Sequence, residues 1–212
     1  MLSRMIANRS EVEGDKIRKG TLNSKELQTV VDTISTLKEL DFKLLDELPK
    51  NEEAVLDFIE TECKEGDVVF IDYINLIINT IRSEPYTSGF DFVRHLKVLG
   101  NNKRITFVIL SQLLKKVEER QGQRPILTDL PYGVLADHAD TIMLLLRREY
   151  YDPCDKPGKA EIIVAKNRNN STGSFYLTYN KEYVKFYNCI PTSYSEFSLE
   201  QLEKEFSSFS PN

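Results

Sequence analysis

Short, continuous runs of apolar residues recur along the chain and alternate with segments of helical periodicity. The run Val68–Ile71, between Asp67 and Asp72, is typical of a strand covered on both faces. The same reasoning predicts strands at Ile105–Leu110, Ile142–Leu146 and Ala160–Ala165, a short one at Phe42–Leu45, and an antiparallel pair, Phe175–Tyr179 and Val184–Tyr187, joined by a turn at Asn180–Lys181.

Helical periodicity fills the intervals between these runs. A first helix is expected over Leu2–Asn8, and Asn23 is placed to cap a second whose apolar residues, from Leu27 to Leu37, share one face. Further helices are expected at Val55–Ile59 and at Phe92–Leu99, the latter ended by Gly100. Strands that alternate with helices predict an α/β fold: a mostly parallel sheet, flanked by helices, with an antiparallel hairpin at its edge.

Composition fits a globular protein. Of 212 residues, 41% are hydrophobic and 29% are charged. No apolar run approaches the roughly 20 residues of a membrane helix, and charged residues near the start argue against a secretory signal. Three widely spaced cysteines form neither a disulfide framework nor a zinc motif, so a reducing cytoplasm is the expected compartment. We expect a core over residues 1–188, then a linker and an acidic tail over 189–212, with a helix at Leu199–Phe206 capped by Ser198.

Charge is unevenly distributed along the chain. The formal net charge is -5, yet the segment from Arg94 to Arg124 holds eight Lys and Arg against Glu118 and Glu119. Because binding to phosphates depends on where charge sits, this segment is a candidate nucleic-acid surface. On charge alone, a solvated basic helix and loop is an equally good interpretation.

Two polar positions follow predicted strands directly. Asp72 ends the first apolar run, and Ser111–Gln112 end the second. Ligands of open α/β sheets bind at such strand ends, and an Asp there is the Walker B arrangement, which holds Mg²⁺ through water beside nucleotide phosphates. The alternative for Asp72 is a turn former or helix cap. His95 and His138 show no ligand spacing, and no Gly-x-x-x-x-Gly-Lys-Ser/Thr motif occurs in the chain.

Several motifs, in one order, together resemble the ATPase domain of DnaB-type replicative DNA helicases, the RecA-like superfamily 4. The resemblance covers residues 1 to about 188. The segments that carry it are Ser3–Asn8, Ile17–Gly20, Val69–Tyr73, Leu110–Leu113 with Val117, Glu118 and Arg120, Arg124–Pro125, Thr128–Leu130, Ala139–Asp140, Arg147, Glu149–Tyr151 and Ala160–Asn169.

This resemblance implies an ATP site that uses Mg²⁺. Asp72 matches the residue that organises Mg²⁺, and Gln112 matches the sensor of the γ-phosphate. Lys166 and Arg168 match a hairpin pair that reaches the nucleotide of a neighbouring subunit, although a solvated strand end would also explain them. Lys115–Gly133 matches loops that line the channel of a hexameric ring and hold single-stranded DNA; the residues implied there are Lys115, Lys116, Arg120, Arg124 and Gly133.

The chain departs from the family pattern in four ways. It begins after the positions of the family's first strand, its Walker A loop and its catalytic Glu, so an N-terminally incomplete RecA-like domain is expected. The family's Asp-Leu-Arg-Glu-Ser-Gly loop is replaced by Asp129–Gly133, which lacks the Arg and Glu. Lys115 stands where Arg is common, and Asn170 where Gly is usual.

Two functional hypotheses follow. The first is the C-terminal part of an ATP-driven helicase ring, homo-hexameric or mixed, acting on single-stranded DNA and on no membrane; a separate chain carrying the Walker A part is one arrangement of it. The second is a non-enzymatic, degenerate module that joins or regulates such a ring. A RecA-family recombinase is a third option, disfavoured by the helicase-like patterns at Arg124–Asp129 and Lys166–Asn170. On either main hypothesis, residues 1–212 alone are expected to be inactive.

Overall fold

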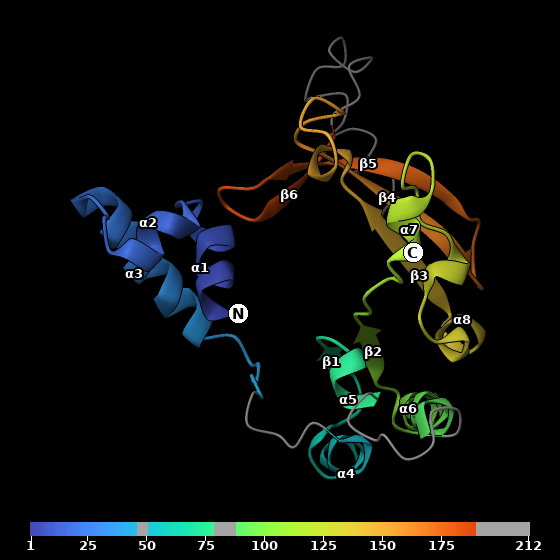
Figure 1. Cartoon of the computed structure of the whole chain (residues 1–212). Helices are drawn as coiled ribbons and strands as arrows, with labels where there is room; N and C mark the ends of the chain where they lie inside the picture. The colour runs from blue at the N-terminus through green and yellow to red at the C-terminus, as the bar shows by residue number, and fades with distance from the viewer. Residues whose placement is uncertain (46–50, 79–87, 190–212) are drawn as a thin grey trace, which may run out of the picture. The chain divides into compact units, whose positions relative to one another are not determined.

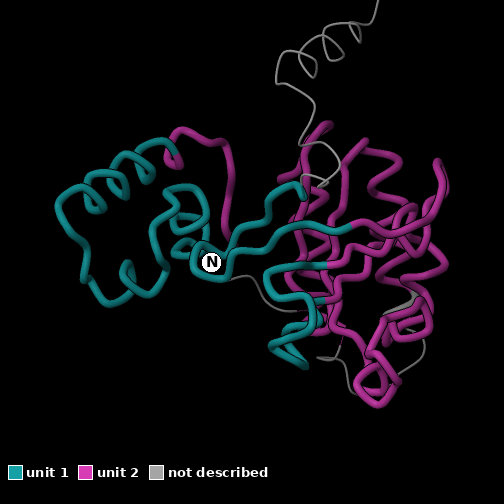
Figure 2. Tube along the Cα trace, turned by 90° about the horizontal axis from the view of Figure 1, so that it is seen from above, with its two compact units in different colours: residues 1–36, 147–160, 176–212 teal, residues 37–146, 161–175 magenta. Residues whose placement is uncertain are grey.

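The computed structural model describes residues 1–45, 51–78 and 88–189 (Figure 1). The chain divides into two compact units (Figure 2). One unit comprises residues 1–36, 147–160 and the chain from 176 onward, and the other comprises residues 37–146 and 161–175. All the candidate site residues lie in the second unit.

A parallel pair of strands forms the centre of the second unit. β1 (Val68–Ile71) pairs with β2 (Thr106–Ile109) in a register that places Ile71 opposite Ile109. The helices α4 (Glu52–Glu62), α5 (Asn75–Ile78) and α6 (Ser88–Lys103) contribute to the core that packs against this pair (Figure 1). The largest side chains buried in that core are Ile59, Ile74, Phe92 and Leu96.

The other strands form a four-stranded sheet in the order β3-β4-β5-β6. β3 (Thr141–Leu146) pairs antiparallel with β4 (Lys159–Asn167), and β5 (Gly173–Asn180) pairs antiparallel with β6 (Lys185–Asn188). Burial alternates along β3. Its buried side chains Ile142 and Leu144 form a second core cluster with Ile163 of β4.

Short helical segments connect β2 to β3 and follow β3. They are α7 (Lys116–Glu119), the 3-10 turn η1 (Leu127–Asp129), α8 (Gly133–His138) and, after β3, the 3-10 turn η2 (Arg148–Tyr150). The basic segment predicted to contact DNA is therefore built from α7, η1 and the loops between them.

The first unit contains α1 (Leu2–Ser10), α2 (Gly14–Lys19) and most of α3 (Ser24–Lys38). Asn23 caps α3 as predicted, since its Oδ1 accepts from Glu26 N at 2.9 Å while the Glu26 carboxylate accepts from Asn23 N at 3.0 Å. The first helices contact the β5–β6 hairpin, where Asn8 Nδ2 donates to Val184 O at 2.9 Å and Lys185 pairs with Glu11 at 2.6 Å.

The predicted α/β class is confirmed, with several local corrections. Residues 42–45 form no strand and are exposed. The parallel pairing holds for β1 and β2, whereas β3 and β4 are antiparallel, so the antiparallel share is larger than predicted. Gly100 lies inside α6 rather than ending it. The predicted linker and the helix at Leu199–Phe206 lie outside the described residues.

Gly100 has a packing role within α6. A Cβ at this position would lie 3.1 Å from Ile105 O and 3.3 Å from the ring of Phe107. The helix therefore approaches β2 at a distance that only glycine permits, and this close packing outweighs the low helix propensity of glycine. Within the described part of the chain, no helix has the length and apolar character needed to cross a membrane.

Candidate nucleotide and DNA sites

The carboxyl ends of β1 and β2 lie side by side, as the sequence predicts. Asp72 follows β1 directly and its side chain is exposed; the peptide bond to Tyr73 is cis. Beyond the strands, Leu110 N donates to Ile71 O and Ile74 N donates to Leu110 O, each at 3.0 Å. Asp72 and the exposed Gln112 therefore lie at one edge of the sheet, open to a solute.

Asn75 is a third polar residue at this edge, and no sequence pattern predicted it. Its Oδ1 accepts a hydrogen bond from Gln112 N at 3.3 Å. Its side chain also hydrogen-bonds Tyr132, whose pKa is raised by burial and partly restored by that bond. Asn75 thus contacts both the strand end that carries Gln112 and the loop that leads to Gly133. Only its place three residues after Asp72 could have drawn attention to it.

The donor set at this edge fits part of a Mg²⁺–nucleotide site. Asp72 offers one carboxylate, and no group of three or more metal-binding side chains occurs among residues 1–45, 51–78 and 88–189. A single carboxylate fits Mg²⁺ held largely through water. Gln112 offers a side-chain amide that can donate to a phosphate oxygen. The glycine-rich phosphate loop does not occur in residues 1–212.

Arg120 is engaged within the protein. Its two guanidinium NH groups donate to the two carboxylate oxygens of Asp129 at 2.7 and 2.8 Å. Asp129 is fully buried and also accepts from Ile126 N at 2.8 Å. The hydrogen bonds from Arg120 hold the pKa of Asp129 below its usual range. This bidentate pair fixes η1 to the end of α7.

Arg124 is held in a similar way. Its Nε and NH2 groups donate to Glu161 of β4 at 3.1 and 2.9 Å, and Glu161 is buried. The two arginines predicted to hold DNA therefore have intramolecular partners that shape the loop. Lys115, Lys116 and Gly133 are exposed, and they remain the predicted contacts that are accessible to a nucleic acid.

Lys166 and Arg168 converge on the C-terminal end of α8. Lys166 Nζ donates to Ala136 O at 2.5 Å and to Asp137 O at 3.2 Å, while Arg168 donates to Asp137 O at 2.8 Å. Cations at a helix C-terminus satisfy carbonyls that have no partner within the helix. The predicted pair thus lies together, bound to the helix that begins at Gly133.

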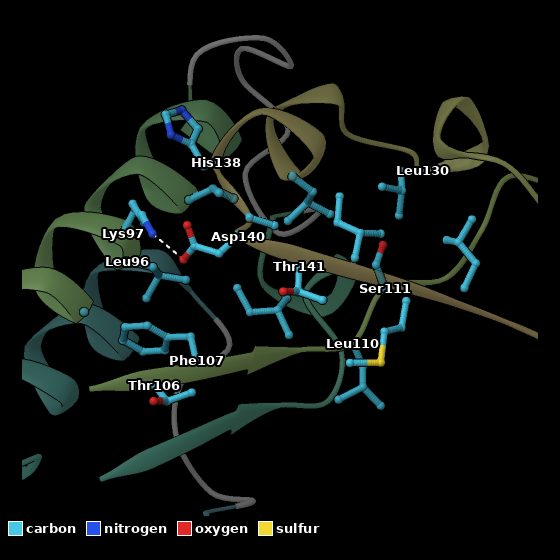
Figure 3. Close-up of a pocket in the computed structure, with 18 of the residues that line it drawn as sticks. Leu96, Lys97, Thr106, Phe107, Leu110, Ser111, Leu130, His138, Asp140 and Thr141 are labelled. Carbon is cyan, nitrogen blue, oxygen red and sulfur yellow. Dashed lines mark hydrogen bonds and ion pairs between the residues drawn. The ribbon is translucent and has the colours of Figure 1, made fainter. Parts of the chain in front are cut away.

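Asp140 completes this cluster. It accepts from Lys97 of α6 at 2.5 Å (Figure 3) and from Arg168 at 3.3 Å. Lys97, more than Arg168, keeps the pKa of Asp140 below its ordinary value. Asp140 therefore fixes the Arg168 guanidinium relative to α6.

The structural neighbours of this chain are RecA-like ATPase domains, in keeping with the strand-end Asp and Gln. A solved ATPase domain of a DnaB-like helicase matches with a TM-score of 0.80 at 26% identity, covering 88% of this chain and 69% of that one. A second DnaB-like replicative helicase, studied for its interactions with primase, has a TM-score of 0.77 at 26% identity, with 89% and 47% covered.

The family itself follows from a match to the model of the DnaB-like helicase C terminal domain over residues 1–188, and the chain belongs to this family. A probable plasmid replicative DNA helicase of Chlamydia trachomatis is 32% identical over 189 residues, which are 88% of this chain and 41% of that protein. The replicative DNA helicase DnaB of Buchnera aphidicola is 30% identical over 203 residues, with 92% and 44% covered. The chain spans less than half the length of these relatives.

Proposed function

We propose that this chain is part of an ATP-dependent replicative DNA helicase that couples ATP hydrolysis to movement on single-stranded DNA. The observation that carries the proposal is the shared position of Asp72 and Gln112 at the carboxyl edge of β1 and β2. Family membership supplies the reaction, and its relatives are named as replicative helicases. The proposed setting is a reducing cytoplasm, in keeping with free Cys63, Cys154 and Cys189.

The chain's own residues have separate roles in this proposal. Asp72 orients the water shell of Mg²⁺, an ion that neutralises phosphate charge when bound. Gln112 hydrogen-bonds the terminal phosphate, and Asn75 connects its backbone to the loop that carries Tyr132. Lys115, Lys116 and Gly133 contact the DNA backbone, so binding is independent of sequence.

The ring is the second part of the proposal. Lys166 and Arg168 contact the nucleotide of a neighbouring subunit, where two cations would offset the charge of the transferring phosphoryl group. To do so they must exchange the carbonyls of α8 for phosphate oxygens. A homo-hexameric or mixed ring, with the phosphate loop supplied by a polypeptide outside residues 1–212, would provide that neighbour.

The test restores the phosphate loop by fusing the part of the Chlamydia trachomatis relative outside the matched 189 residues to residues 1–212. In this protein, Asp72→Asn should lower ATP turnover about 100-fold or more, the effect of removing a group that supports transition-state charge. Asp57→Asn, an exposed site on α4, is the matched control and should leave turnover unchanged. Turnover of Asp72→Asn within about threefold of the parent would assign Asp72 a structural role.

The absence of a phosphate-loop motif from residues 1–212 favours one alternative, a non-enzymatic module that joins or regulates a helicase ring. The same fusion distinguishes the two. A fusion that assembles and binds DNA but hydrolyses no ATP, with Asp72 intact, would favour the module. Turnover that depends on Asp72 would favour the helicase.

A further inference from the structure

Two strand edges in the second unit border the same cavity. β2 is the last strand of the two-stranded sheet, and β3 is the first strand of the four-stranded sheet; among the described residues neither has a second neighbour. A cavity of about 700 Å³ lies between them, lined by Thr106 and Phe107 of β2 and by Thr141 of β3 (Figure 3). Both edges thus offer main-chain N–H and C=O groups to one space.

The side chains around these edges are apolar and exposed. Met143 and Leu145 of β3, both of which line the cavity, are 65% and 50% exposed, and Leu110 after β2 is 43% exposed. Phe70 of β1 is 68% exposed, although its run is typical of a strand covered on both faces. The sequence is therefore written for a sheet with more cover than residues 1–212 supply.

The cavity has the chemistry of a strand site. Adjacent strands lie about 4.8 Å apart, so one inserted strand would bridge two edges about 10 Å apart and satisfy both sets of main-chain groups. The flanking strands are four and six residues long. A helix or a small ligand would leave the edge N–H and C=O groups unpaired, whereas an extended apolar segment pairs with both.

We propose that the groove between β2 and β3 binds an apolar β-strand of four to six residues from a polypeptide outside residues 1–212. The solved ATPase domain with the TM-score of 0.80 shares the fold, yet this chain covers only 69% of it, so that domain contains polypeptide without a counterpart here. The strand is of the kind that such unmatched polypeptide would supply.

The location of the groove deepens the proposed function, on which this step rests. A strand running parallel to β2 would end beside Leu110–Gln112, because parallel strands share a carboxyl edge. Whatever follows that strand would reach the edge that carries Asp72. The strand-binding groove itself does not require ATP hydrolysis.

The experiment co-expresses residues 1–212 with a separate chain, the part of the Chlamydia trachomatis relative outside the matched 189 residues. We expect a purified complex in which amide hydrogen exchange slows about tenfold or more at residues 106–110 and 141–146, as new main-chain hydrogen bonds form. Leu145→Lys should abolish the complex. Leu27→Lys on α3, at a side chain of similar exposure (52% against 50%), should preserve it.

Other occupants give different results. Protection of the same strands in residues 1–212 alone, rising with protein concentration together with a dimer in sedimentation, would overturn the proposal in favour of a second copy of this chain. No complex, or a complex without protection of β2 and β3, would also overturn it. A complex with both strands protected but without ATP turnover would retain the groove and count against the proposed enzymatic function.

Discussion

Asp129 and Glu161 are buried carboxylates, and each is paired with an arginine that the family resemblance assigns to DNA. Their burial explains the pairing, because an uncompensated charge in the interior is strongly unfavourable. Arg120 and Arg124 therefore act first on the protein itself, by fixing the loop between α7 and β4. The sequence shows the basic residues but does not show which are already neutralised by a distant acid.

Asp129→Asn should destabilise the fold by about 2 to 3 kcal/mol, because it removes one partner of a buried pair. The pKa of Asp129 is lower in the folded chain, so its ionised form stabilises the fold above the pKa of the unfolded chain. That contribution is lost as the pH falls through the folded pKa. Urea unfolding at pH 7 and near pH 3 should show the difference between parent and variant shrinking at the lower pH; an unchanged difference would contradict this.

Lys115→Gln with Lys116→Gln should weaken binding to single-stranded DNA and lower its dependence on salt, because each lost phosphate contact removes about 0.7 from the salt slope. Unfolding stability should remain near that of the parent, since both side chains are exposed. Arg120→Gln should behave in the opposite way and lower stability. Fluorescence anisotropy with a labelled oligonucleotide, in the fused protein at several salt concentrations, checks both. Equal stability loss in the two variants would contradict the division.

At the scale of elements, strands were predicted well where the apolar run was continuous. β1, β2, β3 and β4 each fall within or around a predicted run. Failures occurred where a local signal competed with packing. The apolar residues at 42–45 form no strand, and Gly100 reads locally as a helix end although α6 continues against β2. Strand pairing between β3 and β4 depends on distant contacts, which local pattern does not contain.

Gly100→Leu tests the packing of α6 on β2. Although leucine has the higher helix propensity, its Cβ would press on Ile105 O and the Phe107 ring, so the variant should lose about 1 to 3 kcal/mol of stability. Asn102→Leu, at an exposed position on the same helix, is the control and should change stability little. Thermal and urea unfolding of both proteins measure this. A Gly100→Leu variant as stable as the parent would show that α6 can move away from β2.

Across the whole molecule, the nucleotide edge was predictable and the DNA surface was only partly so. Asp72 and Gln112 follow continuous strands, and neighbouring parallel strands share one carboxyl edge, so their proximity follows from topology. Asn75 was missed because its role comes from hydrogen bonds to Gln112 and Tyr132 rather than from a motif. Lys166 and Arg168 were predicted as a pair, but their attachment to α8 depends on a contact about thirty residues away in sequence.

Residues 1–212 alone should bind Mg–ATP weakly and should not unwind DNA. In this fold class most of the affinity for phosphate comes from backbone N–H groups of a glycine-rich loop, its Lys and the helix behind it, and no such motif occurs in the chain. Asp72, without that loop, repels a phosphate unless Mg²⁺ lies between them. Isothermal titration calorimetry with Mg–ATP should therefore detect no micromolar binding. Micromolar affinity at one nucleotide per chain, abolished by neither Asp72→Asn nor Gln112→Ala, would place the nucleotide site elsewhere in the molecule.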